Sequence, residues 1–333
     1  MARRKIGQLS FGESGVVASA GSNDVLERLL RLVDWSRIET LLAPLEGGQM
    51  GPPPYPPLMM FKALLLQRWY ALSDPGLEEA LKDRLSFRRF AGLALSESIP
   101  DHSTLWRFRE AVGPLSQALF GEVVRQIEAS GFVMKQGTLI DASLIPAAVN
   151  PPKRPQEPLP PDADGRAASK LVKSEIDPDA AWTKKGGKYH FGYKLHVAMD
   201  KTSRILRRVI TTPANINESQ EADRLICGDE AVVYADKAYD SKKRSRNLAL
   251  CGIENAIMRR GHPKRPLTRD EVCRNKQIAK HRGAIEPIFH LVKNVHGFAR
   301  ARYRGLARNT TAFTLAAIAM NLKRWTTWRP SPA

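Results

Sequence analysis

Three acidic residues in this chain have the types and settings that metal-dependent chemistry requires. Asp141 follows the strand-like run 138–140, Asp236 follows the apolar run 232–235, and Glu286 lies in a basic stretch. Cleavage of a phosphodiester needs an activated nucleophile and a stabilised leaving oxygen, and two Mg²⁺ ions about 4 Å apart supply both. Mg²⁺ takes hard carboxylate oxygens as ligands. We therefore predict that Asp141, Asp236 and Glu286 are the catalytic and metal-binding residues of a phosphodiester-cleaving site.

The stretch around Glu286 also carries two cations at helical spacing. At about 100° per residue, Arg282, Glu286 and Lys293 project from one face of a helix. This arrangement suits the binding of metal and phosphate together, although a plain Arg–Glu pair at i,i+4 would look the same. Pro287 would clash with the carbonyl of Gly283 inside a helix, so we expect the helix to begin or bend near Glu286.

Each aspartate alone is weak evidence, because aspartate after a strand is commonly a turn or cap residue. Asp200 and Asp240 also follow strand-like or aromatic segments, so they are the competing candidates. The combination of Asp141, Asp236 and the basic helix is more specific than any one of them.

The charge of the chain indicates a polyanionic partner. Its 333 residues carry a net charge of +18, and such an excess favours nucleic acid because each phosphate contact releases counterions. Residues 259–308 contain fourteen Lys or Arg against three acids, a net charge of +11. A ribosome-associated or simply basic protein is the plainer alternative.

The sequence lacks the signatures of zinc sites, of secreted proteins and of membrane proteins. The three cysteines form no CxxC pair and the seven histidines no HExxH motif, which excludes a zinc ribbon and a zincin. No signal-peptide pattern opens the chain, and the late apolar run 312–320 is too short to span a bilayer. We expect a cytoplasmic protein with free thiols and no membrane partner.

The elements that must position these acids fall into two parts. Residues 1–130 are predicted to be helical from position 23 onward, and residues 131–333 to mix strands and helices in an α/β (α+β) sheet domain. A Pro- and Lys-rich insertion is predicted at 150–188. Strands are predicted at 138–145, 189–199, 204–212, 231–236 and 253–258, and helices near 218–227, 241–251, 272–295 and 309–325.

Further residues are candidates for DNA contact. Trp182 stands among lysines and would stack on an unpaired base, or else pack on the sheet. Three arginines alternate along 300–304 and would contact phosphates, with a solvated basic loop as the alternative. His190 and His196 are more simply residues of a sheet than metal ligands. The predicted DNA-binding residues are Arg282, Lys293, Lys237, Trp182, Lys185, Lys188, Lys194, Arg300, Arg302 and Arg304.

Motifs along nearly the whole chain carry a family resemblance. The segments are Pro53–Leu58, Leu85–Phe90 and Pro100–Thr104, then Leu139-Ile140-Asp141, Trp182–Gly186 with Tyr189–Lys194, Tyr234–Tyr239, and the R-x3-E-x6-K pattern of Arg282, Glu286 and Lys293. With them the chain resembles bacterial insertion-sequence transposases of the DDE superfamily, in particular the insertion-sequence-five group. One place departs from that pattern: many relatives have a Tyr where this chain has Ala279, and His281 is a candidate replacement.

The resemblance implies a fold, an activity and partners. The implied fold is an RNase H-like catalytic domain with a five-stranded mixed sheet, after a helical DNA-binding and dimerisation domain. The implied activity is Mg²⁺-dependent cleavage at the element's terminal inverted repeats and strand transfer into target DNA, with two ions bound and Mn²⁺ as a substitute. The implied setting is a homodimer in the bacterial cytoplasm, associated with the nucleoid.

Two other functions share these residues. A stand-alone RNase H-like nuclease would cut without rejoining, and a transposase-derived DNA-binding regulator would have lost an acid. All three acids are present here, which favours an active enzyme.

Overall fold

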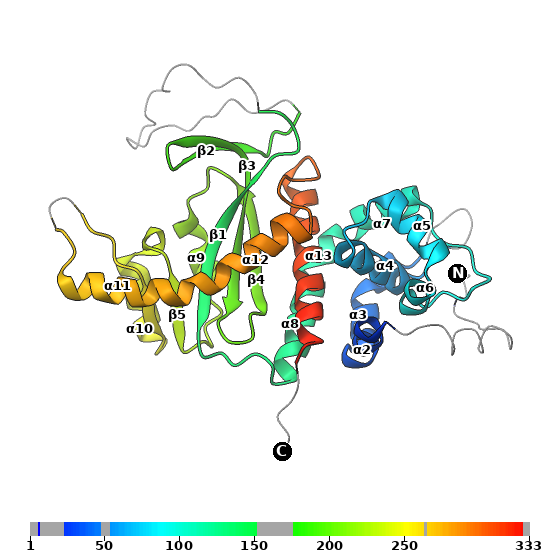
Figure 1. The fold of residues 1–333 in the computed structure, drawn as a ribbon, viewed down its shortest axis with the longest axis horizontal. Helices are drawn as coiled ribbons and strands as arrows, with labels where there is room; N and C mark the ends of the chain where they lie inside the picture. Colours follow the sequence, from blue (N-terminus) through cyan, green and yellow to red (C-terminus); the bar gives the residue numbers. More distant parts are fainter. Residues whose placement is uncertain (1–5, 7–22, 48–53, 152–175, 263–264, 329–333) are drawn as a thin grey trace. The chain divides into compact units, whose positions relative to one another are not determined.

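The computed structural model describes residue 6 and residues 23–47, 54–151, 176–262 and 265–328. They fall into two compact units, one within residues 1–132 and 314–333 and the other within residues 133–313. Figure 1 shows their elements. The last helix, α13 (Leu306–Trp325), belongs to both units, since the division falls after Phe313. The predicted domain boundaries at 130 and 131 stay a prediction.

The first unit is helical, as predicted for residues after position 23. Several of its helices begin with a short polar side chain that accepts a main-chain N–H of the first turn, namely Asn23, Asp34, Ser73 and Asp101. Its elements are α2 (Asp24–Leu32), α3 (Trp35–Leu42), η1 (Ala43–Leu45), α4 (Pro57–Trp69), α5 (Asp74–Asp83), α6 (Leu85–Ala91), α7 (His102–Val112), η2 (Gly113–Leu115) and α8 (Ser116–Ala129).

Helix α4 forms the centre of this unit, because it is buried nearly all round. The last residues of the chain pack against the same unit. Trp69 Nε1 donates to the Ala319 carbonyl at 2.7 Å, and Gln117 Nε2 to Thr314 Oγ1 at 3.0 Å. Arg28 donates to the Trp328 carbonyl at 2.6 Å. Residues 314–328 therefore complete the helical unit.

The second unit is built on a mixed sheet. Its strands are β1 (Thr138–Pro146), β2 (Ala181–Lys185), β3 (Lys188–Asp200), β4 (Leu206–Pro213), β5 (Val232–Ala235) and β6 (Glu254–Ile257). The central order is β4-β3-β1-β5-β6. Strand β3 runs antiparallel to β1 and β4, whereas β1, β5 and β6 are parallel. This arrangement is the predicted RNase H-like fold with its five predicted strands.

Strand β2 is present in the structure but was not among the predicted strands. It pairs antiparallel with the first residues of β3 and forms a hairpin whose turn is Gly186–Gly187. Sequence reasoning assigned it to the insertion at 150–188, because its exposed lysines hide the strand pattern. Residues 152–175 of that insertion lie outside the described residues.

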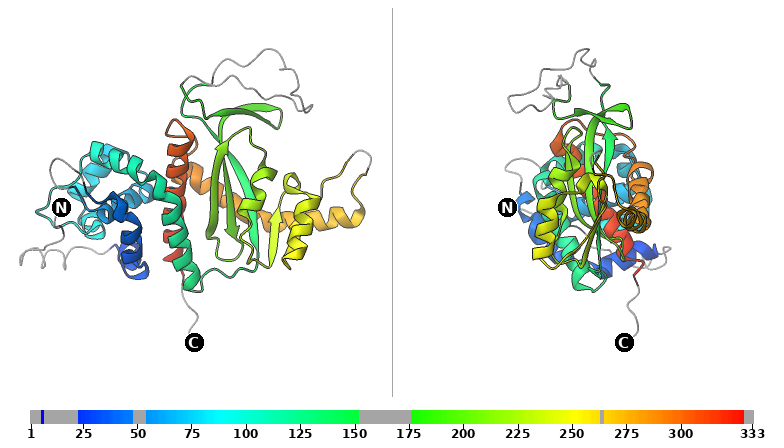
Figure 2. Two further views of the ribbon diagram at one scale, coloured as in Figure 1. Left: turned by 180° about the vertical axis from the view of Figure 1, so that it is seen from behind. Right: turned by 90° about the vertical axis from the view of Figure 1, so that its left-hand side faces the viewer.

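Helices cover both faces of the sheet. Figures 1 and 2 show α9 (Glu218–Leu225) and α10 (Lys242–Leu250) on one face, and α11 (Arg269–Arg282) and α12 (Glu286–His290) on the other. Ile140 belongs to the apolar cluster that contains Leu225 of α9 and Leu248 of α10. Successive strand residues alternate between faces, so Asp141 is directed to the α11 face.

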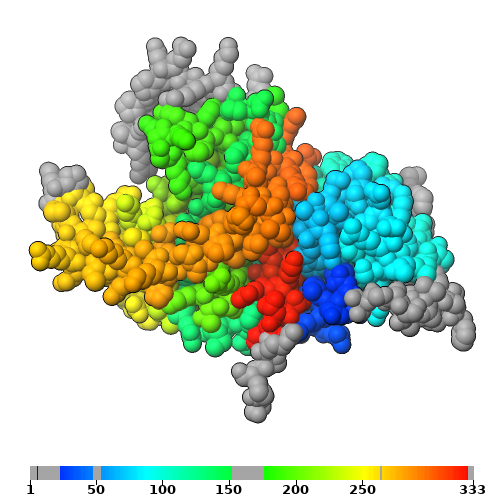
Figure 3. All heavy atoms as spheres, viewed as in Figure 1, coloured from blue at the N-terminus to red at the C-terminus, as the bar shows by residue number. Residues whose placement is uncertain are grey.

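The chain from 269 to 295 is almost continuously helical but not uniform. A 3₁₀ turn, η4 (Gly283–Ile285), joins α11 to α12, and a π-helical turn, η5 (Leu291–Val295), follows. Pro287 is the second residue of α12, where its missing N–H costs nothing. The expectation that a helix begins near Glu286 is confirmed. In Figure 3 these helices lie on the surface of the sheet unit.

Among the helices that the structure describes, none combines the length and apolar character that a bilayer span requires.

Candidate active site

Asp141 and Asp236 stand at the same level on neighbouring parallel strands. In the pairing of β1 with β5, Leu139 is opposite Tyr234. Each aspartate lies two residues beyond its paired residue, so the two carboxylates stand at the same level, Asp141 within β1 and Asp236 just after the end of β5. Neighbouring strands are about 4.8 Å apart. The two acids are therefore adjacent.

Arg282, the last residue of α11, pairs with both aspartates. Its Nη2 lies 3.1 Å from Asp141 Oδ2, and its Nη1 lies 3.8 Å from Asp236 Oδ1. The exposed fractions of the side chains are 22% for Asp141, 38% for Asp236 and 19% for Arg282. The site is thus partly shielded from solvent and still open to a ligand.

Burial and charge act in opposite directions on Asp141. Burial raises the pKa of this carboxyl above its ordinary value, and the neighbouring Asp236 adds to the rise. The cations of Arg282 and Lys185 oppose it by lowering the pKa. The ionised form of Asp141 therefore depends on nearby positive charge.

Glu286 and Lys293 follow Arg282 along the same helical stretch. Glu286 is exposed at the first position of α12, one turn beyond Arg282. Lys293 lies in the π-helical turn, and its pKa is lowered first by burial and then by Lys185. The uniform 100° spacing used above does not apply across the 3₁₀ and π turns, so a shared face for all three side chains stays a prediction.

The carboxylates of Asp141 and Asp236 are ligands that fit a hard divalent cation. Asp141 and Asp236 offer carboxylate oxygens from two strands. Glu286 is an exposed acid one helical turn beyond Arg282, and the ligand atoms of the three acids do not all lie within 4.8 Å of one another in this structure. Arg282 occupies the position beside both aspartates and neutralises part of their charge in this state. Bound metal would compete with this guanidinium for the same oxygens.

The hairpin of β2 and β3 brings Lys185 to the site. Lys185 and Lys188 are paired and exposed next to the hairpin turn, and Lys185 acts on the pKa of Asp141 and of Lys293. Trp182 packs against Phe191, with ring centroids 5.4 Å apart, and its indole N–H is buried without a partner among the described residues. Of the two alternatives for Trp182, stacking on a base or packing on the sheet, this contact corresponds to packing on the sheet.

Lys194 and Lys237, both predicted to contact DNA, differ in position. Lys194 is buried, and its ammonium donates to the Ile216 carbonyl at 2.8 Å. The prediction of a DNA contact by Lys194 does not fit this position, because the ammonium is directed inward. Lys237 is exposed directly after Asp236, whose Oδ1 accepts its main-chain N–H at 2.6 Å.

The three predicted arginines near 300 lie in a connection of bends and do not form an extended strand. Arg300 donates to the carbonyls of Ala147 and Val149, so it holds the chain that follows β1. Arg302 lies over the Phe298 ring, 5.6 Å from its centroid, and Arg304 is exposed. Arg300 and Arg302 are therefore both engaged by the protein itself, since Arg302 also donates to the Gly297 carbonyl at 3.4 Å.

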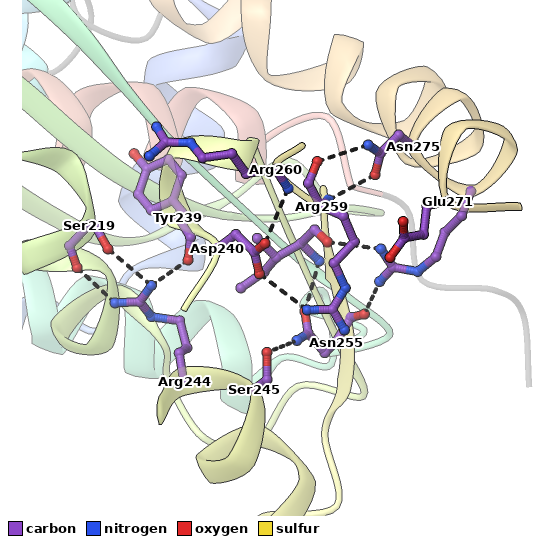
Figure 4. Close-up of polar contacts among 12 residues, drawn as sticks. Ser219, Tyr239, Asp240, Arg244, Ser245, Asn255, Arg259, Arg260, Glu271 and Asn275 are labelled. Atoms are coloured by element: carbon purple, nitrogen blue, oxygen red, sulfur yellow. Dashed lines mark hydrogen bonds and ion pairs between the residues drawn. The ribbon is translucent and has the colours of Figure 1, made fainter. Parts of the chain in front are cut away.

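The competing aspartates have structural roles. Asp200 is fully buried, and its Oδ2 accepts the N–H and hydroxyl of Ser203, each at 2.7 Å. Asp240 pairs with Arg259 at 3.2 Å and accepts the Arg260 N–H, as Figure 4 shows. These contacts explain both residues without a metal.

The histidines have no ligand-like setting. His196 is buried and hydrogen-bonds Thr212 Oγ1 at 2.9 Å, and His190 lies on β3 in the hairpin. His281 stacks on Tyr234 at 5.2 Å between centroids, and Ala279 is exposed on α11. Tyr234 precedes Asp236 by two residues on the chain, so His281 lies close to the site.

A second group of potential ligands lies away from these residues. Ligand atoms of Cys227, Asp229 and Glu230 lie within 4.8 Å of one another. Arg207 and Lys135 pair with Asp229 at 2.7 and 2.6 Å, and Glu230 accepts main-chain N–H groups of this loop. The cations already balance this group, so it holds the loop together.

Two polar residues that sequence reasoning did not single out lie on elements that adjoin the strands of the aspartates, since α9 packs against β1 and η3. Glu218 begins α9, and Tyr239 ends the short turn η3 (Lys237–Tyr239) after Asp236. The signal available for Glu218 was its place just after a helix cap, Asn217, four residues beyond the end of β4. That signal does not reveal that α9 packs against β1 and η3, which depends on the folded chain.

Comparison with known families identifies the class of protein to which the chain belongs. No solved structure matches the chain. Residues 18–111 match a transposase domain, DUF772. Residues 134–322, more than half of the chain, match the transposase DDE domain. The chain therefore belongs to the DDE transposases, phosphoryl-transfer enzymes that act on DNA with divalent metal ions.

Proposed function

We propose that this transposase cleaves DNA at the ends of an insertion sequence and joins the freed ends to target DNA, with Asp141, Asp236 and Glu286 holding two Mg²⁺ ions. The observation that carries the proposal is the matched position of Asp141 and Asp236 on adjacent parallel strands beside one arginine. A transposase of the insertion-sequence-five group, active as a homodimer on terminal inverted repeats, is the finer assignment that we infer.

The residues would divide the work by their chemistry. The three acids bind cation only when ionised, and the bound metal activates the attacking oxygen and stabilises the leaving oxygen. Arg282, Lys293, Lys185, Lys188 and Lys237 would bind phosphates near the scissile bond, since each is a cation near the acids or on the hairpin beside them. Mn²⁺ would replace Mg²⁺, because both accept carboxylate oxygens.

The test replaces single acids by their amides. We expect Asp141→Asn and Asp236→Asn to lower Mg²⁺-dependent cleavage of element-end DNA by on the order of 10³-fold, as when charge stabilisation of a transition state is lost. DNA binding should stay within about threefold, because each amide keeps the shape of the acid. Asp270→Asn, on the exposed first turn of α11, is the matched control.

Cleavage at the normal rate by Asp141→Asn would show that the site is assigned wrongly. Joining of pre-cut ends to a plasmid separates the transposase from a nuclease, which would cut without joining. Binding without any nicking in Mg²⁺ or Mn²⁺ would indicate a regulator.

A further inference from the structure

Residues 258–260 follow β6 as an irregular segment, and side chains from α11 and from the turn after Asp236 hold it in place. The main-chain N–H of Arg259 donates to Asn275 Oδ1 at 2.9 Å, and Asn275 Nδ2 donates to the Arg259 carbonyl at 3.0 Å (Figure 4). Asn275 is buried on α11. Main-chain groups outside regular structure need such partners, and here one amide fixes α11 to the segment by two hydrogen bonds.

Asp240 holds the same segment from the side of Asp236. Its Oδ1 lies 3.2 Å from Arg259 Nη1, and its Oδ2 accepts the main-chain N–H of Arg260 at 3.2 Å (Figure 4). Asp236 and Asp240 flank the short turn η3. Residues 258–260 are therefore joined both to α11 and to the turn that follows Asp236.

Met258, the first residue of the segment, contacts the site directly. Its main-chain N–H donates at 3.0 Å to the carbonyl of Ala235, the residue before Asp236. Its Sδ accepts a hydrogen bond at 3.8 Å from Arg282 Nη1, the nitrogen that pairs with Asp236 Oδ1. The segment thus contacts both the strand that ends before Asp236 and the guanidinium that pairs with both aspartates.

The spacing of residues on α11 links the position of Asn275 to that of Arg282. Arg282 lies seven residues, about two helical turns, after Asn275, so the two side chains project from the same side of the helix. Ile278 lies between them and is also buried. Arg274 adds a further bond between α11 and the end of β6, since its Nη1 donates to the Ile257 carbonyl at 2.9 Å. A shift of α11 along the sheet would carry Arg282 with it.

We propose that residues 258–260 position the Arg282 guanidinium against the two aspartates of the site. Asn275 and Asp240 are the positioning residues, since they act through this segment and not on DNA or metal. Displacement of a group by about 1 Å can lower a rate by about 10²-fold, so the bonds that hold α11 in place matter for the reaction. The inference rests on the proposed metal site and on the phosphate contact proposed for Arg282.

The experiment measures single-turnover cleavage of element-end DNA by the full-length protein at saturating DNA and Mg²⁺, so that slow variants remain measurable. We expect Asn275→Ala to lower the rate about tenfold, because α11 loses both hydrogen bonds to Arg259 and the guanidinium is displaced. Asp240→Asn should lower the rate about threefold, because an amide still accepts the Arg260 N–H but loses the charge pairing with Arg259. DNA affinity should stay within about threefold in both variants, since neither removes a cation.

A double-mutant cycle separates the positioning of Arg282 from a role in stability alone. In the Arg282→Gln background the guanidinium is absent, so Asn275→Ala should change the rate by less than about twofold. A residue that only stabilises the fold would lower the rate by the same factor in both backgrounds. Gln277→Ala is the matched control, because it removes an exposed amide from the same helix. Thermal melts check that each variant is folded at the assay temperature.

Equal losses in the two backgrounds, or normal rates in both Asn275→Ala and Asp240→Asn, would overturn this inference. A normal rate in Arg282→Gln would overturn it as well. Asp141→Asn separates these results from failure of the proposed function. If Asp141→Asn loses cleavage while the two positioning variants cut normally, only the positioning role is wrong. If Asp141→Asn also cleaves normally, the metal site itself is wrong.

Discussion

Arg282 decides the charge balance of the site at the scale of single residues. It is the cation within pairing distance of both Asp141 and Asp236. Adjacent carboxylates raise one another's pKa, and the raised pKa of Asp141 shows that burial already works in the same direction. Without Arg282, ionisation of Asp141 would require a higher pH.

This balance predicts a pH effect of Arg282→Gln. Removal of the guanidinium should raise the pKa of Asp141 further, so the acid form persists to higher pH. A cation binds the ionised form, and we therefore expect the pH of half-maximal Mn²⁺ binding to move upward by about one unit. Arg269→Gln, at the start of the same helix, is the control, and a shift downward would contradict the argument.

At the scale of elements, the pairing of β1 with β3 positions Asp141, and Gly192 is its tightest point. Gly192 has φ +153°, and a Cβ at this residue would lie 2.3 Å from the Ile145 carbonyl oxygen. Real side chains cannot approach main-chain atoms so closely. The two strands can pair as far as Pro146, five residues beyond Asp141, because Gly192 has no side chain.

We expect Gly192→Ala to force the strands apart and to lower the free energy of unfolding by about 2 kcal/mol or more. Gly121→Ala is the matched control, since it lies within α8, where a Cβ meets nothing within 4 Å. Alanine there should be neutral or stabilising by up to about 1 kcal/mol. Chemical denaturation measures both, and equal stability of the two variants would contradict the steric argument.

Strand β3 also carries the buried residue His196, and its burial predicts that the folded protein loses stability in acid. Burial lowers the pKa of His196 from 6.5 to about 4, so the folded protein keeps it neutral. Between these values the unfolded chain binds a proton that the folded chain does not, and stability falls as the pH falls. We expect the free energy of unfolding of His196→Gln to depend less on pH between 6.5 and 4 than that of the unaltered protein does. Chemical denaturation at each pH measures both. An unchanged slope would contradict it.

The sequence predicted those parts of the site that depend on local pattern. Apolar runs that end in Asp141 and Asp236 identify two strands, and Pro287 identifies the start of α12. Strand β2 was missed, because exposed lysines replace the alternation that marks a strand. Glu218 and Tyr239 were missed because the contact between their two elements, which Arg244 holds, is made by the folded chain and no spacing along the sequence reveals it. Lys194 was assigned to DNA for the same reason.

At the scale of the whole molecule, the charge of +18 governs how this transposase meets DNA. Much of it lies in residues 259–308, which include α11 and α12 on the surface of the sheet unit (Figure 3). Phosphate contacts release counterions, so binding that depends on many such contacts weakens steeply with salt.

We expect affinity for a duplex of arbitrary sequence to fall about 10³-fold or more between 50 and 200 mM salt, as for proteins that make six or more phosphate contacts. Fluorescence anisotropy with a labelled duplex measures this slope. Binding that changes less than about tenfold over that range would show that most of the positive charge does not contact DNA.

The use of residues 314–328 to complete the helical unit has a consequence for synthesis. The hydrogen bonds of Trp69 to Ala319 and of Arg28 to Trp328 join residues made early in translation to residues made late. We therefore expect a nascent chain to keep its amino-terminal helices sensitive to protease until residue 328 has left the ribosome. Protease resistance of ribosome-arrested chains that stop at residue 313 would contradict this. On this ordering, a prematurely terminated product could not present a finished helical unit to DNA and compete there with the complete enzyme.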